Sequence, residues 1–235
     1  MKLPPDRPRR EFLVRAGAAM ATLHGVAPPT PAPTRPAGRR REEAPTPAED
    51  LMREHGVLSR ILLVYGEAVR RLEAGVELLP EAVSAAAGIV RRFGHDYHEK
   101  LEEEQVFPLF AKAGTLVALV DVLKAQHEAG RRLTADILGL ATPAMAGDAR
   151  TRQTLVSRLR SFTRMYRPHE AREDTVLFPA LRRLVSEHEY RALGERFERR
   201  ERELLGERGF AGIVDEVAEL EKGLGLYELG QFTAD

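Results

Sequence analysis

The sequence predicts an all-α protein, an antiparallel up-down four-helix bundle with a C-terminal helical extension. The first observation behind this prediction is an internal repeat. Residues 98–108 recur as residues 169–179, and both copies read His-Glu, two variable residues, Glu, an acidic residue and, further on, Phe-Pro. The second observation is that a lone histidine precedes each copy, with His55 lying 43 residues before His98 and His127 lying 42 residues before His169. The repeating unit is therefore two helices, and two such hairpins packed antiparallel make a four-helix bundle.

Apolar residues at three- and four-residue steps place the bundle helices at about residues 48–73, 80–113, 115–140 and 148–184. Pro80 suits a first helical turn, Gly114 suits a helix end, and Asp148 is a candidate N-cap. Pro168 lacks the N–H that a helix interior needs, so an interruption with a kink is expected there. Two further helical patterns follow the bundle and are expected to cover it. The predicted parts of the chain are residues 1–47, a bundle over 48–186 and an extension over 187–235.

The composition removes several classes of function. Thirty-six basic residues balance thirty-six acidic ones, so the overall charge does not favour nucleic acid or an anionic membrane surface. The chain has no cysteine, which excludes disulfides, iron–sulfur clusters and a cysteine nucleophile. No apolar run approaches the ~18 residues of a membrane span, so no membrane insertion of the body is expected. A homo-oligomer is not indicated. Any bound metal must be held by nitrogen and oxygen.

The first 47 residues carry a pattern that differs from the rest of the chain. Arg9 and Arg10 are followed by a mildly apolar stretch over 16–27, which resembles a twin-arginine export signal. This pattern favours export, with a periplasmic location. The alternative is a basic tail on a cytoplasmic protein. Residues 28–47 are rich in proline and charge and are interpreted as a linker.

The spacing within the repeat predicts metal binding. His98 and Glu102 are four residues apart, as are His169 and Glu173, and such pairs lie on one face of an α-helix. His55 and His127 each fall on the apolar stripe of their own helix. A single histidine on such a stripe is more often a hydrogen-bonded core residue, but this reading weakens when four helices repeat the feature. Burying two carboxylates without a cation or hydrogen-bond donors would also be costly. The predicted ligands are His55, His98, Glu102, His127, His169 and Glu173.

Other metal motifs fit the sequence less well. A ferritin-like site needs Glu three residues before His, and no histidine here has one. A zinc protease needs His-Glu-x-x-His, whereas both copies here carry Glu at the last position. His95 and Tyr166 lie three residues before the repeat histidines and are interpreted as groups that orient the site, with direct ligation by His95 as the alternative. Solvent exposure is expected for the remaining candidates, Glu99, Glu103, Glu104, Glu170 and His188.

The order of a lone His, then His-x-x-x-Glu, then a lone His, then His-x-x-x-Glu resembles the hemerythrin-like, HHE cation-binding family over about residues 48–186. The resemblance implies a four-helix bundle that encloses two non-haem irons joined by carboxylate bridges. It also implies that the four histidines of this pattern are terminal ligands and that Glu102 and Glu173 bridge the metals. Imidazole and carboxylate donors suit manganese and zinc as well, so donor types alone do not select iron.

The chain departs from oxygen-carrying hemerythrins at one position. Those proteins have a second histidine one turn after the ligand of the third helix, where this chain has Arg131. One iron therefore lacks an imidazole, which puts reversible oxygen carriage in doubt. They also use an aspartate five residues after the last histidine, and Asp174 stands there. Repeat symmetry favours Glu173, since four residues keep the helix face and five turn away from it.

Three hypotheses for function follow from these patterns. In the first, the di-iron site binds or reacts with dioxygen, peroxide or nitric oxide, in a sensing, scavenging or redox role. In the second, the protein is a non-catalytic iron-binding or storage module, in which the metal chiefly holds the bundle together. In the third, the bundle holds no metal and acts through its amphipathic C-terminal helix. The sequence leaves open whether the protein is an enzyme.

Overall fold

Four long helical rods form the body of the protein in a computed structural model, which describes residues 45–234. The first rod is α1 (Pro47–Ala74), and the third is α5 (Val117–Leu140). The second joins α2 (Pro80–Ile89), η1 (Val90–His98), α3 (Glu99–Leu101), η2 (Glu102–Val106) and α4 (Phe107–Ala113). The fourth joins α6 (Ala149–Arg172), η4 (Glu173–Leu177) and α7 (Phe178–Leu184). No strand occurs among residues 45–234, which confirms the all-α prediction.

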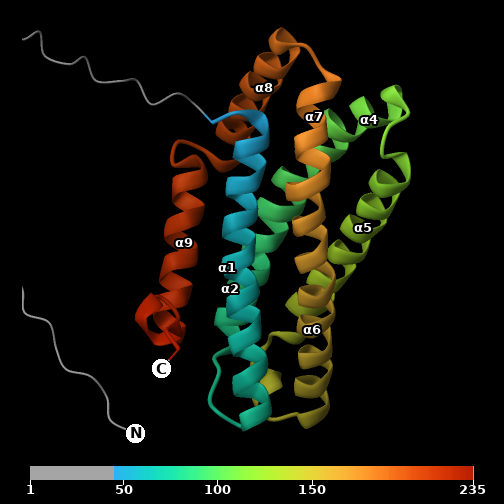
Figure 1. The fold of residues 1–235 in the computed structure, drawn as a ribbon. Helices are drawn as coiled ribbons and strands as arrows, with labels where there is room; N and C mark the ends of the chain where they lie inside the picture. The colour runs from blue at the N-terminus through green and yellow to red at the C-terminus, as the bar shows by residue number, and fades with distance from the viewer. Residues whose placement is uncertain (1–44, 235) are drawn as a thin grey trace, which may run out of the picture. The chain divides into compact units, whose positions relative to one another are not determined.

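The ends of the rods follow from local sequence. Thr46 caps α1 through a capping box with Glu49, and a left-handed Gly75 with φ 66° ends the helix. Gly114, with φ 64°, ends the second rod at the predicted position. The Asp148 side chain accepts hydrogen bonds from the backbone at the start of α6, as expected of an N-cap. Successive rods therefore reverse direction over short connections, as Figure 1 shows.

Three segments of the rods are π-helical, and the sequence analysis missed them. η2 begins at Glu102 and η4 begins at Glu173, so the same wide turn starts at the same residue of both repeats. In each, the backbone N–H of the repeat phenylalanine bonds to the carbonyl of that glutamate, five residues earlier. The next residue is proline, which has no N–H and crowds the carbonyl four residues before it. A wider turn relieves this crowding, and such turns are frequent at functional sites.

The fourth rod departs from expectation at Pro168. This residue lies inside α6, whose helical pattern runs on to Arg172, so the predicted interruption at Pro168 is wrong. Its missing N–H removes one hydrogen bond on the exposed side of the helix without ending it. The irregularity of this rod begins instead at Glu173.

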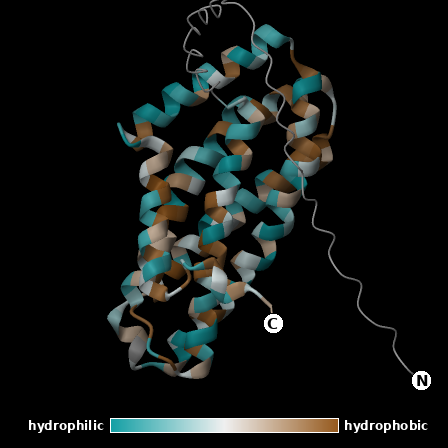
Figure 2. Ribbon diagram, turned by 60° about the vertical axis from the view of Figure 1, so that its left-hand side comes forward, coloured by the Kyte–Doolittle hydropathy of each residue, from teal (hydrophilic) through white to brown (hydrophobic). Residues whose placement is uncertain are grey.

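The rods pack through their apolar stripes, and two further helices cover them. α5 packs on α6, and α1 contacts both α6 and α9 (Gly209–Leu224) (Figure 1). Hydrophobic and hydrophilic residues alternate along the helices in Figure 2, as expected of amphipathic helices. Arg60 of α1 holds Glu221 of α9 with two hydrogen bonds, the longer of them 2.9 Å. α8 (Glu187–Leu205) begins at a Ser186 capping box, and a short 3-10 helix, η5 (Leu229–Phe232), ends the described chain. Another 3-10 helix, η3 (Pro143–Ala146), precedes α6.

The predicted export segment and most of the predicted linker lie outside the described residues. The described residues 45–234 belong to one compact unit, and the predicted boundary at residue 186 stays a prediction. Across residues 45–234, no helix is both long and apolar enough to span a membrane.

Candidate metal centre

The four predicted histidines form two facing pairs in the interior of the bundle. His55 of α1 and His98 of the second rod place their Nε2 atoms 3.0 Å apart. His127 of α5 and His169 of α6 place theirs 3.2 Å apart. Each pair comes from one hairpin of the repeat. Two nitrogen lone pairs this close repel each other unless a proton or a cation lies between them.

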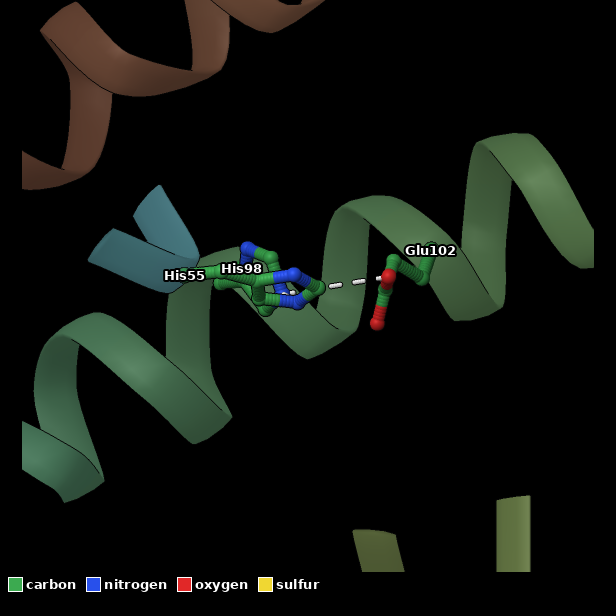
Figure 3. Close-up of side chains that lie close together, drawn as sticks. All are labelled: His55, His98 and Glu102. Atoms are coloured by element: carbon green, nitrogen blue, oxygen red, sulfur yellow. Dashed lines mark hydrogen bonds and ion pairs between the residues drawn. The ribbon is translucent and has the colours of Figure 1, made fainter. Parts of the chain in front are cut away.

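Two glutamates connect the pairs. Glu102 lies between His98 and His127, with carboxylate oxygens 3.8 Å and 3.4 Å from their Nε2 atoms. Glu173 lies 3.1 Å from Nε2 of His169 and 3.4 Å from Nε2 of His55. Figure 3 shows His55 reaching from α1 toward His98 and Glu102 on the second rod. Each carboxylate therefore faces one imidazole of its own hairpin and one of the other hairpin.

The outer nitrogen of every histidine in this cluster faces an oxygen acceptor. Nδ1 of His55 lies 2.7 Å from Asp174, and Nδ1 of His98 lies 2.7 Å from Glu54. Nδ1 of His127 lies 3.1 Å from Glu103, and Nδ1 of His169 lies 2.9 Å from Gln126. An acceptor at Nδ1 holds the proton on that atom and leaves the Nε2 lone pair directed inward. All four rings are thereby prepared to donate to a cation at the centre.

The sequence analysis missed this role of Glu54, Gln126 and Glu103, although the sequence carried a signal. Glu54 and Gln126 each stand immediately before a lone histidine, and Glu103 and Asp174 each stand immediately after a repeat glutamate. The internal repeat thus extends to the groups that orient the rings. Periodicity within one helix could not find them, because every acceptor comes from a different helical rod than the ring it orients.

The cluster is closed to solvent. Its six residues are at most 3% exposed. The repeat phenylalanines add to this closure, since Phe107 stacks on His127 at 5.6 Å and Phe178 stacks on His55 at 5.5 Å between ring centroids. Such stacking fixes ring orientation and excludes water.

The two buried carboxylates of the cluster need positive charge nearby to balance them. Burial alone would lower the pKa of His127, but the nearby carboxylates of Glu102 and Glu103 raise it to about 10. Burial would likewise lower the pKa of His55, but Asp174 and Glu173 raise it well above its usual value. The pKa of Glu173 is held well below its usual range by His169 and His55, against the effect of burial. The imidazoles thus hold protons that bound cations would replace.

The donor atoms fit metal ions. Three-residue groups of ligand atoms within 4.8 Å of one another occur at His55, His98 and Glu102, and at His127, His169 and Glu173. All four carboxylate oxygens of Glu102 and Glu173 are buried without a hydrogen-bond donor among the described residues. Buried carboxylates in this state are costly, and coordination to a cation removes that cost. Nitrogen and oxygen donors are common to iron, manganese and zinc sites.

A second buried network surrounds Glu99, beside His127. Nδ1 of His95 lies 2.8 Å from Glu99, Tyr166 donates its phenolic O–H to the same carboxylate, and Arg131 lies 2.9 Å from it. Nε2 of His95 bonds to Thr134 at 2.8 Å, so both its nitrogens face groups outside the six-residue cluster. His95 and Tyr166 thus both bond to Glu99, which lies outside the six-residue cluster.

The expectation that Glu99 and Glu170 are exposed is wrong. Glu99 is 1% exposed, because His95 and Tyr166 form hydrogen bonds with it and Arg131 forms an ion pair with it in place of water. Glu170 is 5% exposed, and Ser59 donates to it at 2.9 Å. Burial raises the pKa of Glu170.

The other expected solvent contacts differ from residue to residue. Glu103 is half-buried and pairs with Arg131 at 2.5 Å and Lys100 at 2.6 Å. Glu104 and His188 are exposed, as predicted.

The fold and the site define a class: an all-helical protein whose rods enclose paired histidine and glutamate clusters suited to cations. The family model described as "Hemerythrin HHE cation binding domain" matches residues 46–180 and 119–225. The chain belongs to this family. The predicted resemblance is therefore confirmed.

The curated relatives cover nearly the whole chain. The uncharacterized protein Rv1995 of Mycobacterium tuberculosis and the uncharacterized protein Mb2018 of Mycobacterium bovis are each 46% identical to it over 236 residues. Each match covers 98% of this chain and 92% of the relative. No solved structure matches the chain significantly.

Proposed function

We propose that the chain binds two non-haem iron ions in an up-down four-helix bundle and that this centre binds or reacts with dioxygen, peroxide or nitric oxide. His55 and His98 would hold one ion, and His127 and His169 the other. Glu102 and Glu173 would bridge the two. Iron is proposed over manganese and zinc because of the resemblance to hemerythrins.

One observation carries the proposal. Two imidazole pairs, each with Nε2 atoms about 3 Å apart, are connected by two carboxylates that have no other donor among the described residues. Two imidazole nitrogens this close together would suit a single ion as shared donors. Because each carboxylate faces both pairs, the arrangement favours two ions over one.

The residues around the cluster leave little space, which favours a small ligand over a bulky one. The six cluster residues are almost inaccessible to solvent. Phe178 stacks on the ring of His55, and Phe107 stacks on the ring of His127. A bulky organic substrate would require the rods to separate, whereas a molecule of two to four atoms would not. Bound iron would supply the electrons that such ligands accept. Tyr166, whose ring lies 5.2 Å from that of His169 between centroids, donates its phenolic O–H to Glu99, and His95 bonds to the same carboxylate.

Elemental analysis tests the binuclear part of the proposal. Protein produced with sufficient iron is expected to hold two ions per chain, and one ion or none would contradict it. Reaction of the iron form with peroxide then separates a reactive centre from a storage module. A reactive centre consumes peroxide with a change in its absorption spectrum over repeated additions, and a purely structural ion does not.

Export through the twin-arginine-like segment is proposed separately, from the sequence alone. Fractionation of cells that express the full chain tests it, with Arg9→Lys and Arg10→Lys together as the control. Periplasmic protein that disappears in the double variant would support export. Equal cytoplasmic amounts of both forms would contradict it.

A further inference from the structure

The two imidazole pairs have different acceptors at their Nδ1 atoms. The first difference is between Glu54 and Gln126, which occupy equivalent positions in the repeat. Glu54 Oε2 lies 2.7 Å from Nδ1 of His98, and Gln126 Oε1 lies 2.9 Å from Nδ1 of His169. Glu54 is 1% exposed, and its second oxygen accepts a hydrogen bond from the neutral Tyr97 hydroxyl at 2.8 Å. The repeat thus puts a charged carboxylate behind one ring and an uncharged amide behind the other.

The other two Nδ1 acceptors, Asp174 and Glu103, also leave more negative charge behind the His55–His98 pair. Asp174 faces Nδ1 of His55 at 2.7 Å, whereas Glu103 faces Nδ1 of His127 at 3.1 Å. Glu103 is also paired with Arg131 at 2.5 Å and Lys100 at 2.6 Å, so its negative charge is largely offset. Arg131 also pairs with Glu99, so the two acids Glu99 and Glu103 on the His127–His169 side are balanced by Arg131 and Lys100.

A carboxylate behind a ligating imidazole strengthens the metal bond in two ways. It makes Nε2 a stronger electron donor, and it adds a negative charge close to the cation. An amide oxygen orients the ring as well but does neither, and a nearby guanidinium opposes the cation directly.

We infer that the two half-sites have unequal affinities, so that the His55–His98 half-site fills first and the Glu54–Gln126 difference sets the order. The inference rests on the proposed binuclear site. It assigns Glu54 and Gln126 as positioning residues that act through His98 and His169.

Anaerobic titration of the metal-free full chain with Co²⁺, followed by calorimetry and visible absorption, tests this inference. The unmodified chain is expected to bind in two resolved steps. Glu54→Gln should weaken the first step by about 10- to 100-fold and leave the second nearly unchanged. Gln126→Glu should tighten the second step by about 10-fold. A double swap should bring the two steps together or reverse them.

Two control variants accompany the titration, and its contrary outcomes separate failure of the unequal half-sites from failure of the binuclear centre. Glu104→Gln and Glu128→Gln change exposed carboxylates on the second rod and on α5 and should alter neither step. Helical circular dichroism of each metal-free variant checks folding, and Gln126→Glu tests the inference even where Glu54→Gln unfolds. Two Co²⁺ ions with equal affinity, or a Gln126→Glu variant with both steps unchanged, would overturn the unequal half-sites alone. Fewer than two ions at saturation would overturn the proposed binuclear centre.

Discussion

Asp174 accepts a hydrogen bond from His55, since its Oδ1 lies 2.7 Å from Nδ1 on the outer side of the ring. Glu173, the preceding residue, faces the Nε2 atoms of His55 and His169 on the inner side. The two adjacent carboxylates therefore occupy opposite sides of one imidazole. This arrangement agrees with the separation expected of residues four and five places after His169.

The first prediction separates these two carboxylates. Glu173→Gln is expected to lose one ion or the bridge between two, because it removes an inward oxygen. Asp174→Asn is expected to retain two ions with affinity reduced by about 10-fold, because only the orientation and donor strength of His55 change. Elemental analysis and the iron absorption spectrum measure both effects. Iron loss in Asp174→Asn together with two ions in Glu173→Gln would show that the aspartate is the ligand.

The second prediction concerns Arg131, which stands where oxygen carriers have an imidazole. It pairs with Glu99 and Glu103 instead of facing the Nε2 atoms, so one iron would have one nitrogen ligand fewer. Air is therefore expected to oxidise the di-ferrous form irreversibly. Absorption spectra through cycles of aeration and degassing measure this. A reversible spectrum over several cycles would contradict the prediction.

The third prediction concerns metal removal. Without cations, only protons on the imidazoles can balance the negative charges of the two buried carboxylates. The raised pKa values of His55 and His127 indicate this balance. Adding metal at about 100 times its dissociation constant should stabilise the fold by about 2.7 kcal/mol. Thermal unfolding of the chelated and reloaded protein measures the difference. Equal midpoints would mean that folding does not depend on the site.

The fourth prediction concerns Asp50, near the start of α1. Burial, followed by the charge of Glu54, raises the pKa of Asp50 to about 6. The folded state therefore binds this proton more tightly than the unfolded state does. The stability that Asp50 contributes is present below about pH 4 and is lost as the pH rises through about 6.

Asp50→Asn removes this ionisable carboxyl. Its effect on the free energy of unfolding should therefore be about 1–2 kcal/mol more stabilising at about pH 7.5 than at about pH 4, after allowance for partial solvent screening. Urea unfolding at the two pH values measures the change. Asp96→Asn, which changes an exposed aspartate on the second rod, is the control. The same stabilisation at both pH values would mean that the carboxyl proton is not responsible.

The sequence by itself determined the helical class and the six inward-facing histidine and glutamate residues of the cluster. Helical periodicity is a local property, so the apolar stripes, Gly114 and the His-x-x-x-Glu spacing could be interpreted without knowing how the helices pack. The absence of cysteine restricted the donors to nitrogen and oxygen. The internal repeat supplied the pairing of hairpins, because equal segments fold into equal elements.

Only the tertiary structure decided which groups surround the ligand candidates. The acceptor of His55 lies 119 residues away in the chain, and that of His98 lies 44 residues away. Such contacts depend on the register of packed rods, which no pattern within one helix encodes. The burial of Glu99 is of the same kind, since Arg131 and Tyr166 reach it from two other helices. The wide turns at Glu102 and Glu173 also became visible only in three dimensions, because four-residue spacing does not distinguish an α-turn from a π-turn.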